Sequence, residues 1–208
     1  LLVQVAEADS AALQCTVVRG GTLQSRKSLA APGLTVASPT LTEEDLQNLQ
    51  LAGAGGVTWV MLPFVRGAED IRTLRRALEQ AGARQVRSFA KIESLAGVQA
   101  LPEFLPLVDE VVIARGDLGN AMPLWELPRC QKQLSAVCRS AGVPFMALTH
   151  MLDSMCSRAV PTRAEVSDIY NAAADGASSV MLTGETAAGQ YPVEAMEYLV
   201  RTARTALE

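Results

Sequence analysis

From residue 41 onwards, short apolar runs alternate with amphipathic stretches along the chain. Each run is bounded by glycine, proline or polar residues, a pattern typical of buried strands. The stretches between them carry apolar residues at helical spacing, as Ile71, Leu74 and Leu78 do. We expect a first helix from Thr42 and then five strand-and-helix units. The predicted strands are 57–62, 86–92, 111–114, 143–148 and 179–182, and the helices after them are 69–80, one following Ser94, 131–140, one beginning at Thr162, and 192–206.

The start of one of these helices is specified by a capping box. Thr162 and Glu165 have the spacing in which the Thr hydroxyl accepts from the third helical amide and the Glu carboxylate reaches back to the cap amide. Pro161 directly precedes the motif, and Asp175-Gly176 is expected to end the helix.

The fold class predicted from this pattern is α/β. Near-continuous apolar strands joined by helices imply a parallel sheet covered by helices. An open doubly wound sheet and part of an eight-stranded (β/α) barrel both fit, and a barrel would be incomplete because a whole one needs about 250 residues. Residues 1–40 differ, with apolar stretches at 1–6 and 13–18, a turn at 19–22 and a β-rich segment that ends at Pro32-Gly33.

Composition and charge narrow the class of protein. The 208 residues are 49% hydrophobic and 19% charged, with a formal net charge of -4 at pH 7, which argues against a nucleic-acid surface. No apolar run approaches the ~18 residues of a membrane helix, and no secretion signal opens the chain. We therefore expect a cytoplasmic protein with no membrane or nucleic-acid partner. The four cysteines, Cys15, Cys130, Cys138 and Cys156, are expected to be buried and reduced.

Charged residues follow the second predicted strand. Lys91 and Glu93 are two positions apart, so both should face the inside of the sheet while Ile92 packs outward against the helices. Inward charges are costly unless they are paired or bound to a ligand. Two interpretations are therefore open. Lys91 and Glu93 either form a salt bridge at the rim of the sheet, or they bind an anionic substrate through the ammonium and its metal through the carboxylate.

The next strand ends carry further polar groups. Gly116 and Asp117 come after the third strand, where a glycine lets backbone amides approach an anion and an Asp offers oxygen to a hard cation, although an ordinary turn explains them as well. Thr149 and His150 follow the fourth strand, as hydrogen-bonding or proton-relaying groups or as structural residues. The loop 183–189 after the fifth strand either contacts phosphate or is a simple surface loop.

Taken together, these residues resemble the pyruvate kinase family. The likeness covers about residues 20–208, and its motifs agree with the family in order and spacing. The stretches that carry it are Lys91-Ile92-Glu93, Ala114-Arg115-Gly116-Asp117-Leu118-Gly119, Pro161-Thr162-Arg163-Ala164-Glu165 and Met181-Leu182-Thr183-Gly184-Glu185-Thr186-Ala187.

The resemblance implies a TIM-type (β/α)₈ barrel, of which 31–208 would form part, while 1–30 would be a remnant of the small β lid domain. It implies phosphate transfer between phosphoenolpyruvate and ADP, giving pyruvate and ATP. Glu93 and Asp117 would be ligands of Mg²⁺ or Mn²⁺, and Lys91 would stabilise the transferring phosphoryl group and the enolate. The Gly116 and Asp117 amides would hold the substrate carboxylate, and Thr149 would lie near the methylene carbon that is protonated.

The sequence departs from the family at several points. The strands that carry its K⁺ ligands have no counterpart here, and Pro63, His150 and Asn120 replace the usual serine, glutamine and β-branched residue. These departures favour a non-catalytic interaction module as the alternative to the kinase. A metal-dependent 2-oxo acid lyase is a third possibility, because it also needs a metal-bound enolate. Because five strands cannot close a barrel, we also expect further strands, a partner chain or a homo-oligomer.

Overall fold

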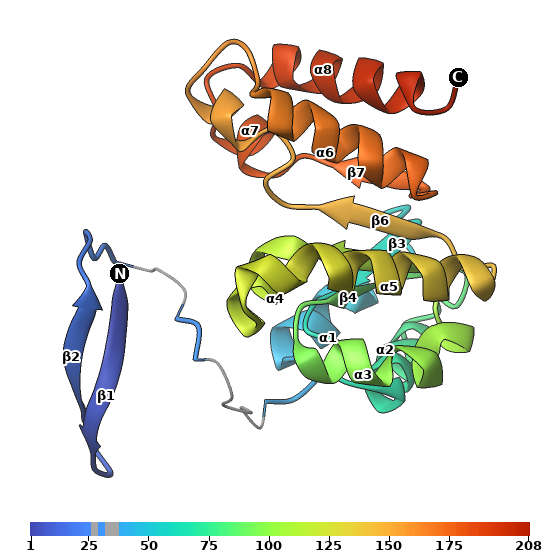
Figure 1. Ribbon diagram of the computed structural model, residues 1–208. Coiled ribbons are helices and arrows are strands. Elements are labelled where there is room, and N and C mark those ends of the chain that lie inside the picture. The colour runs from blue at the N-terminus through green and yellow to red at the C-terminus, as the bar shows by residue number, and fades with distance from the viewer. Residues whose placement is uncertain (26–28, 32–37) are drawn as a thin grey trace. The chain divides into compact units, whose positions relative to one another are not determined.

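The computed structural model describes residues 1–25, 29–31 and 38–208 (Figure 1). The chain divides into two compact units, Leu1–Ala31 and Pro32–Glu208. The predicted end of the β-rich segment at Pro32-Gly33 lies outside the described residues. Within those residues, no helix combines the length and apolar character that a bilayer crossing requires.

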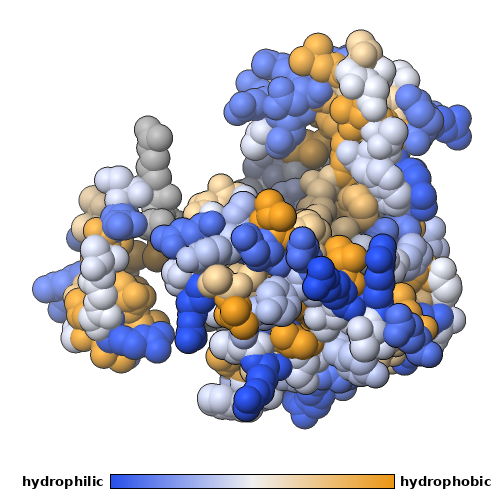
Figure 2. Space-filling model, turned by 90° about the horizontal axis from the view of Figure 1, so that it is seen from above, coloured by the Kyte–Doolittle hydropathy of each residue, from blue (hydrophilic) through white to orange (hydrophobic). Residues whose placement is uncertain are grey.

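The first unit is an antiparallel hairpin of β1 (Leu2–Ala8) and β2 (Leu13–Arg19). Its turn lies at Asp9, whose Oδ1 accepts from the Ala11 and Ala12 amides at 2.7 and 2.8 Å. Arg19 ends β2 and residues 20–22 form no regular turn, although the sequence predicted a turn at 19–22. Residues on both faces are exposed, and Figure 2 shows hydrophobic side chains at the hairpin surface. Cys15 is therefore exposed, contrary to expectation.

The second unit contains a five-stranded parallel sheet, which confirms the α/β fold class and is consistent with an incomplete (β/α) barrel. Its spatial order follows the chain, and each strand pairs with the next. The strands are β3 (Trp59–Leu62), β4 (Arg87–Ile92), β5 (Glu110–Ala114), β6 (Phe145–Leu148) and β7 (Ser179–Met181).

Helices connect these strands and cover one face of the sheet, and Figure 1 shows α6 and α8 side by side. Short 3₁₀ turns complete the connections as η1 (Leu105–Leu107), η2 (Leu124–Glu126) and η3 (Asp153–Cys156). The α-helices are α1 (Glu43–Gln50), α2 (Ala68–Gln80), α3 (Leu95–Phe104), α4 (Arg115–Ala121), α5 (Leu127–Ser140), α6 (Arg163–Ala174), α7 (Gly184–Ala187) and α8 (Pro192–Thr205).

Alternation along the strands separates two apolar layers. Ile92 and Ile113 are fully buried in the cluster that contains Ile71, Leu74 and Leu78 of α2. The opposite face carries the smaller cluster of Val112, Ala114, Met146 and Leu148. Phe89 packs against this second cluster, and Lys91 lies two residues further along the same face of β4.

The caps at the two predicted helix starts form as expected. At α6, Thr162 Oγ1 accepts from the Glu165 amide, and Glu165 Oε2 accepts from the Thr162 amide at 2.8 Å. At α1, Thr42 is the N-cap, and Asp45 returns the contact with Oδ2. These reciprocal bonds satisfy amides that the helix itself leaves without acceptors.

The burial of the cysteines agrees only in part with the prediction from the sequence. All four cysteines are unpaired; Cys130 and Cys138 of α5 are buried, whereas Cys156 is only partly buried. Burial raises the pKa of the Cys138 thiol to about 11. The expectation of four buried thiols is therefore correct for two of them.

Candidate active site

The end of β4 carries a buried carboxylate in contact with an ammonium. The Glu93 side chain is 1% exposed, and its Oε1 lies 2.6 Å from Nζ of Lys91, whose side chain is 21% exposed. The rim salt bridge that the sequence left open is thus present.

The second oxygen of Glu93 is fixed by the end of β3. Its Oε2 accepts a hydrogen bond of 2.7 Å from the Phe64 amide. Phe64 has a φ of +50°, in the left-handed region that costs a non-glycine residue about 1–3 kcal/mol. The residue whose amide holds the Glu93 carboxylate therefore has a strained backbone conformation.

Among the described residues, the buried Glu93 Oε1 has the Lys91 ammonium at 2.6 Å as its partner, whereas Oε2 is bound by a backbone amide. A buried carboxylate oxygen in this state keeps lone pairs available for a cation.

The end of β5 continues into a short helix rather than a loop. Arg115–Ala121 form α4, although an ordinary turn was one interpretation of Gly116 and Asp117. Leu118 is fully buried, and this packing compensates for the poor helix propensity of two glycines. Asp117 lies in the first turn of α4 with an exposed side chain, one strand away from Glu93.

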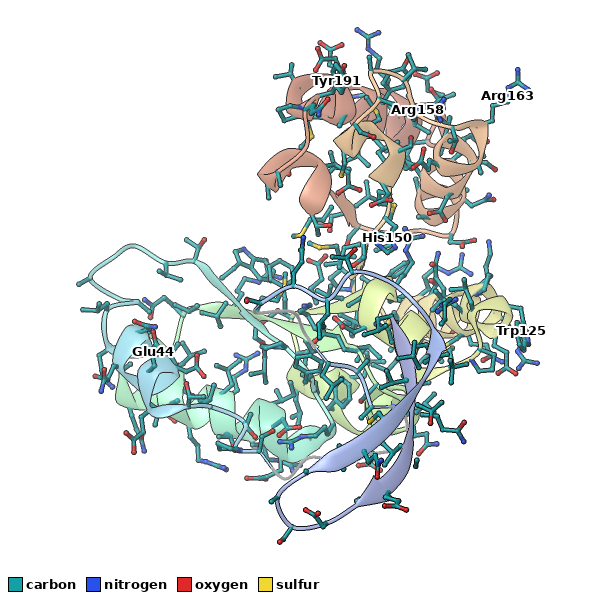
Figure 3. All side chains as sticks on the ribbon, turned by 90° about the vertical axis from the view of Figure 1, so that its left-hand side faces the viewer. Glu44, Trp125, His150, Arg158, Arg163 and Tyr191 are labelled. Atoms are coloured by element: carbon teal, nitrogen blue, oxygen red, sulfur yellow. The ribbon has the colours of Figure 1, made fainter. Side chains whose placement is uncertain are left out.

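Gly116 and Thr149 come together across the ends of β5 and β6. A Cβ on Gly116 would lie 2.7 Å from Thr149 Cγ2, so only glycine fits there without a shift. Thr149 has a φ of +78° and His150 a φ of +52°, so both residues adopt the left-handed backbone conformation. Figure 3 shows His150, whose side chain is exposed, where the chain leaves β6 towards α6.

The segment after β7 is built around a buried carboxylate. Glu185 Oε1 accepts from the Leu152 amide at 3.0 Å, and Oε2 accepts from the Thr183 amide at 2.8 Å. Burial raises the pKa of Glu185, but the hydrogen bonds lower it by more, so the pKa lies below its usual value. Both Glu185 oxygens are thus used by backbone amides of the protein, so this residue of the 183–189 segment has a structural role.

The oxygen donors fit a divalent metal that substrate helps to hold. No group of three His, Cys, Asp or Glu side chains converges in the described part of the chain. Mg²⁺ commonly binds through one or two carboxylates together with substrate oxygens and water, so a protein-only cage is not required. The carboxylates of Glu93 and exposed Asp117, at the ends of neighbouring strands, match that donor set.

Sequence reasoning missed two residues that shape this edge of the sheet. Phe64 acts through its backbone amide, which no side-chain motif reveals. Arg115 bonds the carbonyls at the end of β6, although it lies inside the motif used for the resemblance. An arginine directly after an apolar strand was the available signal for a buried, multiply bonded cation.

The parallel sheet with its helices, and the charged groups at its carboxyl edge, are those of an incomplete (β/α)-barrel domain. The family model "Pyruvate kinase, barrel domain" matches residues 1–196. The chain therefore belongs to the pyruvate kinase family.

Curated relatives named pyruvate kinase agree with this assignment. The protein of Geobacillus stearothermophilus is 41% identical over 197 residues, which are 95% of this chain and 34% of that protein. The protein of Mycobacterium intracellulare is 41% identical over 90% of this chain and 39% of its own length. The protein of Chlamydia pneumoniae is 42% identical over 93% of this chain and 40% of its own length. The chain thus spans about a third to two fifths of the relatives it matches.

Proposed function

We propose that this chain supplies the metal- and substrate-binding part of an enzyme that transfers phosphate from phosphoenolpyruvate to ADP, giving pyruvate and ATP. The observation that carries the proposal is the buried Glu93 carboxylate at the carboxyl end of β4, paired with the partly exposed Lys91 side chain at 2.6 Å. Family membership supports the same chemistry.

Lys91 is proposed to serve the transferring phosphoryl group. Its Nζ contacts the Glu93 carboxylate, and its side chain is partly exposed at the carboxyl end of β4, where an anionic substrate would bind. Phosphoryl transfer depends mainly on positioning and on neutralisation of charge. One ammonium placed at the phosphoryl and enolate oxygens contributes to both.

Glu93 and Asp117 are proposed to hold Mg²⁺ or Mn²⁺. When bound, such an ion would neutralise charge on phosphoryl and enolate oxygens. Glu93 is kept in place by the Phe64 amide, whereas Asp117 lies in the first turn of α4 with an exposed side chain. The family's K⁺ remains a prediction from the resemblance.

The Gly116 and Asp117 amides are proposed to bind the substrate carboxylate. They lie in the first turn of α4, where amides lack helical acceptors. Thr149, packed against Gly116, is then beside the bound substrate. We propose that it serves protonation of the enol methylene, which converts the enol into pyruvate.

The assignment of 1–30 to a lid remnant and 31–208 to the barrel is part of this proposal. The sheet ends at β3 and β7, and no described strand pairs with either outer edge. Further strands, from the same polypeptide or from a homo-oligomer, are proposed to complete the barrel.

A non-catalytic, pyruvate-kinase-like binding module is the second candidate. The exposed Asp117 and the presence of Pro63 and His150 at site positions favour it. Such a module would retain affinity for Mg²⁺ and an enolate analogue without turning substrate over.

The test uses the protein as expressed from its own gene. Pyruvate formation is measured with phosphoenolpyruvate, ADP and Mg²⁺, and oxalate binding is measured by calorimetry with and without Mg²⁺. ADP-dependent pyruvate formation supports the kinase. Mg²⁺-dependent oxalate binding without turnover supports the binding module, and nucleotide-independent cleavage of an oxo acid supports a lyase.

A further inference from the structure

Arg115 is a buried cation that joins the end of β5 to the end of β6. Its side chain is 10% exposed, and Nε donates to the Leu148 carbonyl at 3.2 Å. One terminal nitrogen donates to the Thr149 carbonyl at 2.6 Å and lies 3.2 Å from Met151 Sδ. The other pairs with Asp168 of α6 at 2.5 Å. The guanidinium thus donates hydrogen bonds to two successive carbonyls, and its charge is balanced by the Asp168 carboxylate.

The two carbonyls flank a strained residue. Thr149 has a φ of +78°, and a β-branched residue in the left-handed region is a clear outlier that needs support from its surroundings. Arg115 holds the peptide groups on both sides of the Thr149 Cα. These peptide planes set the direction in which its side chain leaves the backbone.

Gly116 limits the same side chain from another direction. Its Cα is so close that an added Cβ would lie 2.7 Å from Thr149 Cγ2 and 3.5 Å from Oγ1. Consecutive residues therefore fix Thr149, one through its backbone and the other through contact with its methyl group. Neither contact uses the hydroxyl group, which remains available.

We infer that Arg115 is a positioning residue that aims the Thr149 hydroxyl at the enol methylene. The inference rests on the proposed function. In the step concerned, the methylene carbon gains a proton and forms a C–H bond, and the enolate C–O becomes the pyruvate carbonyl. The Thr149 hydroxyl gives its proton and recovers one from water. Arg115 touches no reacting atom.

The test separates proton transfer from substrate binding. Arg115→Lys keeps a cation for Asp168 but cannot hold both carbonyls, and Arg115→Met removes the cation. In the protein as expressed from its own gene, exchange of pyruvate methyl hydrogens with D₂O is followed by NMR with Mg²⁺ and ATP. We expect exchange and kcat to fall about 100-fold in both variants, because misplacement of about 1 Å has that effect. The KM for phosphoenolpyruvate and the affinity for Mg²⁺–oxalate should stay within about twofold.

Arg75→Met is the matched control. Arg75 also bonds a carbonyl, that of Leu107 at 3.3 Å, and an aspartate, Asp109 at 2.9 Å, but at the amino-terminal edge of the sheet. Its loss should lower stability and leave exchange and kcat unchanged.

The outcomes distinguish the two proposals. Wild-type exchange and kcat in Arg115→Lys, in an active protein, overturn the positioning role alone, and so does a parallel loss of oxalate affinity. A wild-type protein that forms no pyruvate overturns the proposed function and this inference with it. If Arg115→Met does not fold, Arg115→Lys decides, because it retains the ion pair.

Discussion

Gly116 lies so close to Thr149 that a methyl group on its Cα would meet Thr149 Cγ2 at 2.7 Å. This contact joins the ends of two neighbouring strands and requires glycine through a close approach, since Gly116 is not among the glycines with positive φ. It links a residue proposed to bind the substrate carboxylate with one proposed to serve protonation.

Gly116→Ala is expected to lower kcat for pyruvate formation about 100-fold, because Thr149 must shift. Steady-state kinetics measures this effect. Gly119→Ala on the same helix is the control, since its Cβ would lie 3.4 Å from the flexible end of Leu127 and should leave kcat unchanged. The double variant Gly116→Ala/Thr149→Ser lacks the clashing methyl group and should recover part of the loss; no recovery would contradict the explanation.

Lys91→Met is expected to abolish phosphoryl transfer, with at most about a thousandth of kcat remaining. The fold should persist but lose about 3–5 kcal/mol, because a buried carboxylate loses its counter-charge. Mg²⁺ should raise the Tm of this variant more than that of the wild type, since Glu93 Oε1 then has no other cation. Thermal unfolding with and without Mg²⁺ measures the difference.

The matched variant for that experiment is Glu93→Gln, in which the Mg²⁺-dependent rise in Tm should disappear. An undiminished rise in Glu93→Gln would remove Glu93 from the metal site. Unchanged kcat in Lys91→Met would reject the role given to Lys91.

Glu185→Gln is expected to destabilise the protein in a pH-dependent way. The folded pKa of Glu185 lies below its ordinary value of 4.5, so its carboxylate contributes fully above that pH, and the contribution is lost as pH falls through the folded pKa. We expect a deficit of about 1.5–3 kcal/mol at pH 7 that shrinks below pH 4.5. Urea unfolding across this range measures it.

Glu197→Gln provides the comparison for Glu185. Glu197 is exposed and pairs with Arg201 on α8 at 3.5 Å, so its replacement should change stability by less than about 1 kcal/mol. A deficit for Glu185→Gln that is constant with pH would show that titration of this carboxyl does not couple to folding.

Gly97→Ala is expected to cost about 1–3 kcal/mol by overpacking. A Cβ there would lie 2.5 Å from the Val65 carbonyl oxygen, which is backbone and cannot rotate away. Val65 donates its amide to the Lys91 carbonyl, so the shift should also reach the candidate site. Gly53→Ala, whose Cβ would have its nearest neighbour at 3.9 Å, is the control. Equal stability of the two variants would contradict this prediction.

The strands and most helices follow from the sequence because their apolar residues repeat with the period of the element. The run at 143–148 gave β6, and Ile71, Leu74 and Leu78 gave the buried side of α2. The cap of α6 could also be predicted from the sequence, because Thr162 and Glu165 are only three residues apart. In each case the determining residues are neighbours along the chain.

The parts that sequence reasoning missed depend on residues far apart in the chain. Helix α4 forms where an ordinary turn was one interpretation of the sequence, since Leu118 enters a core assembled from other elements. The left-handed conformations of Phe64 and Thr149 are supported by Glu93 and Arg115, which lie about 30 residues away. Local propensity contains no information about such long-range support.

In the described part of the chain, no strand pairs with the outer sides of β3 and β7, and this affects how these residues are best produced in soluble form. Backbone groups along an unpaired strand are a template for any extended chain nearby, including another copy in mid-synthesis. Soluble yield should therefore depend on how quickly these edges are covered, so dilute refolding or co-expression with complementary strands should help more than substitutions in an already well-packed interior.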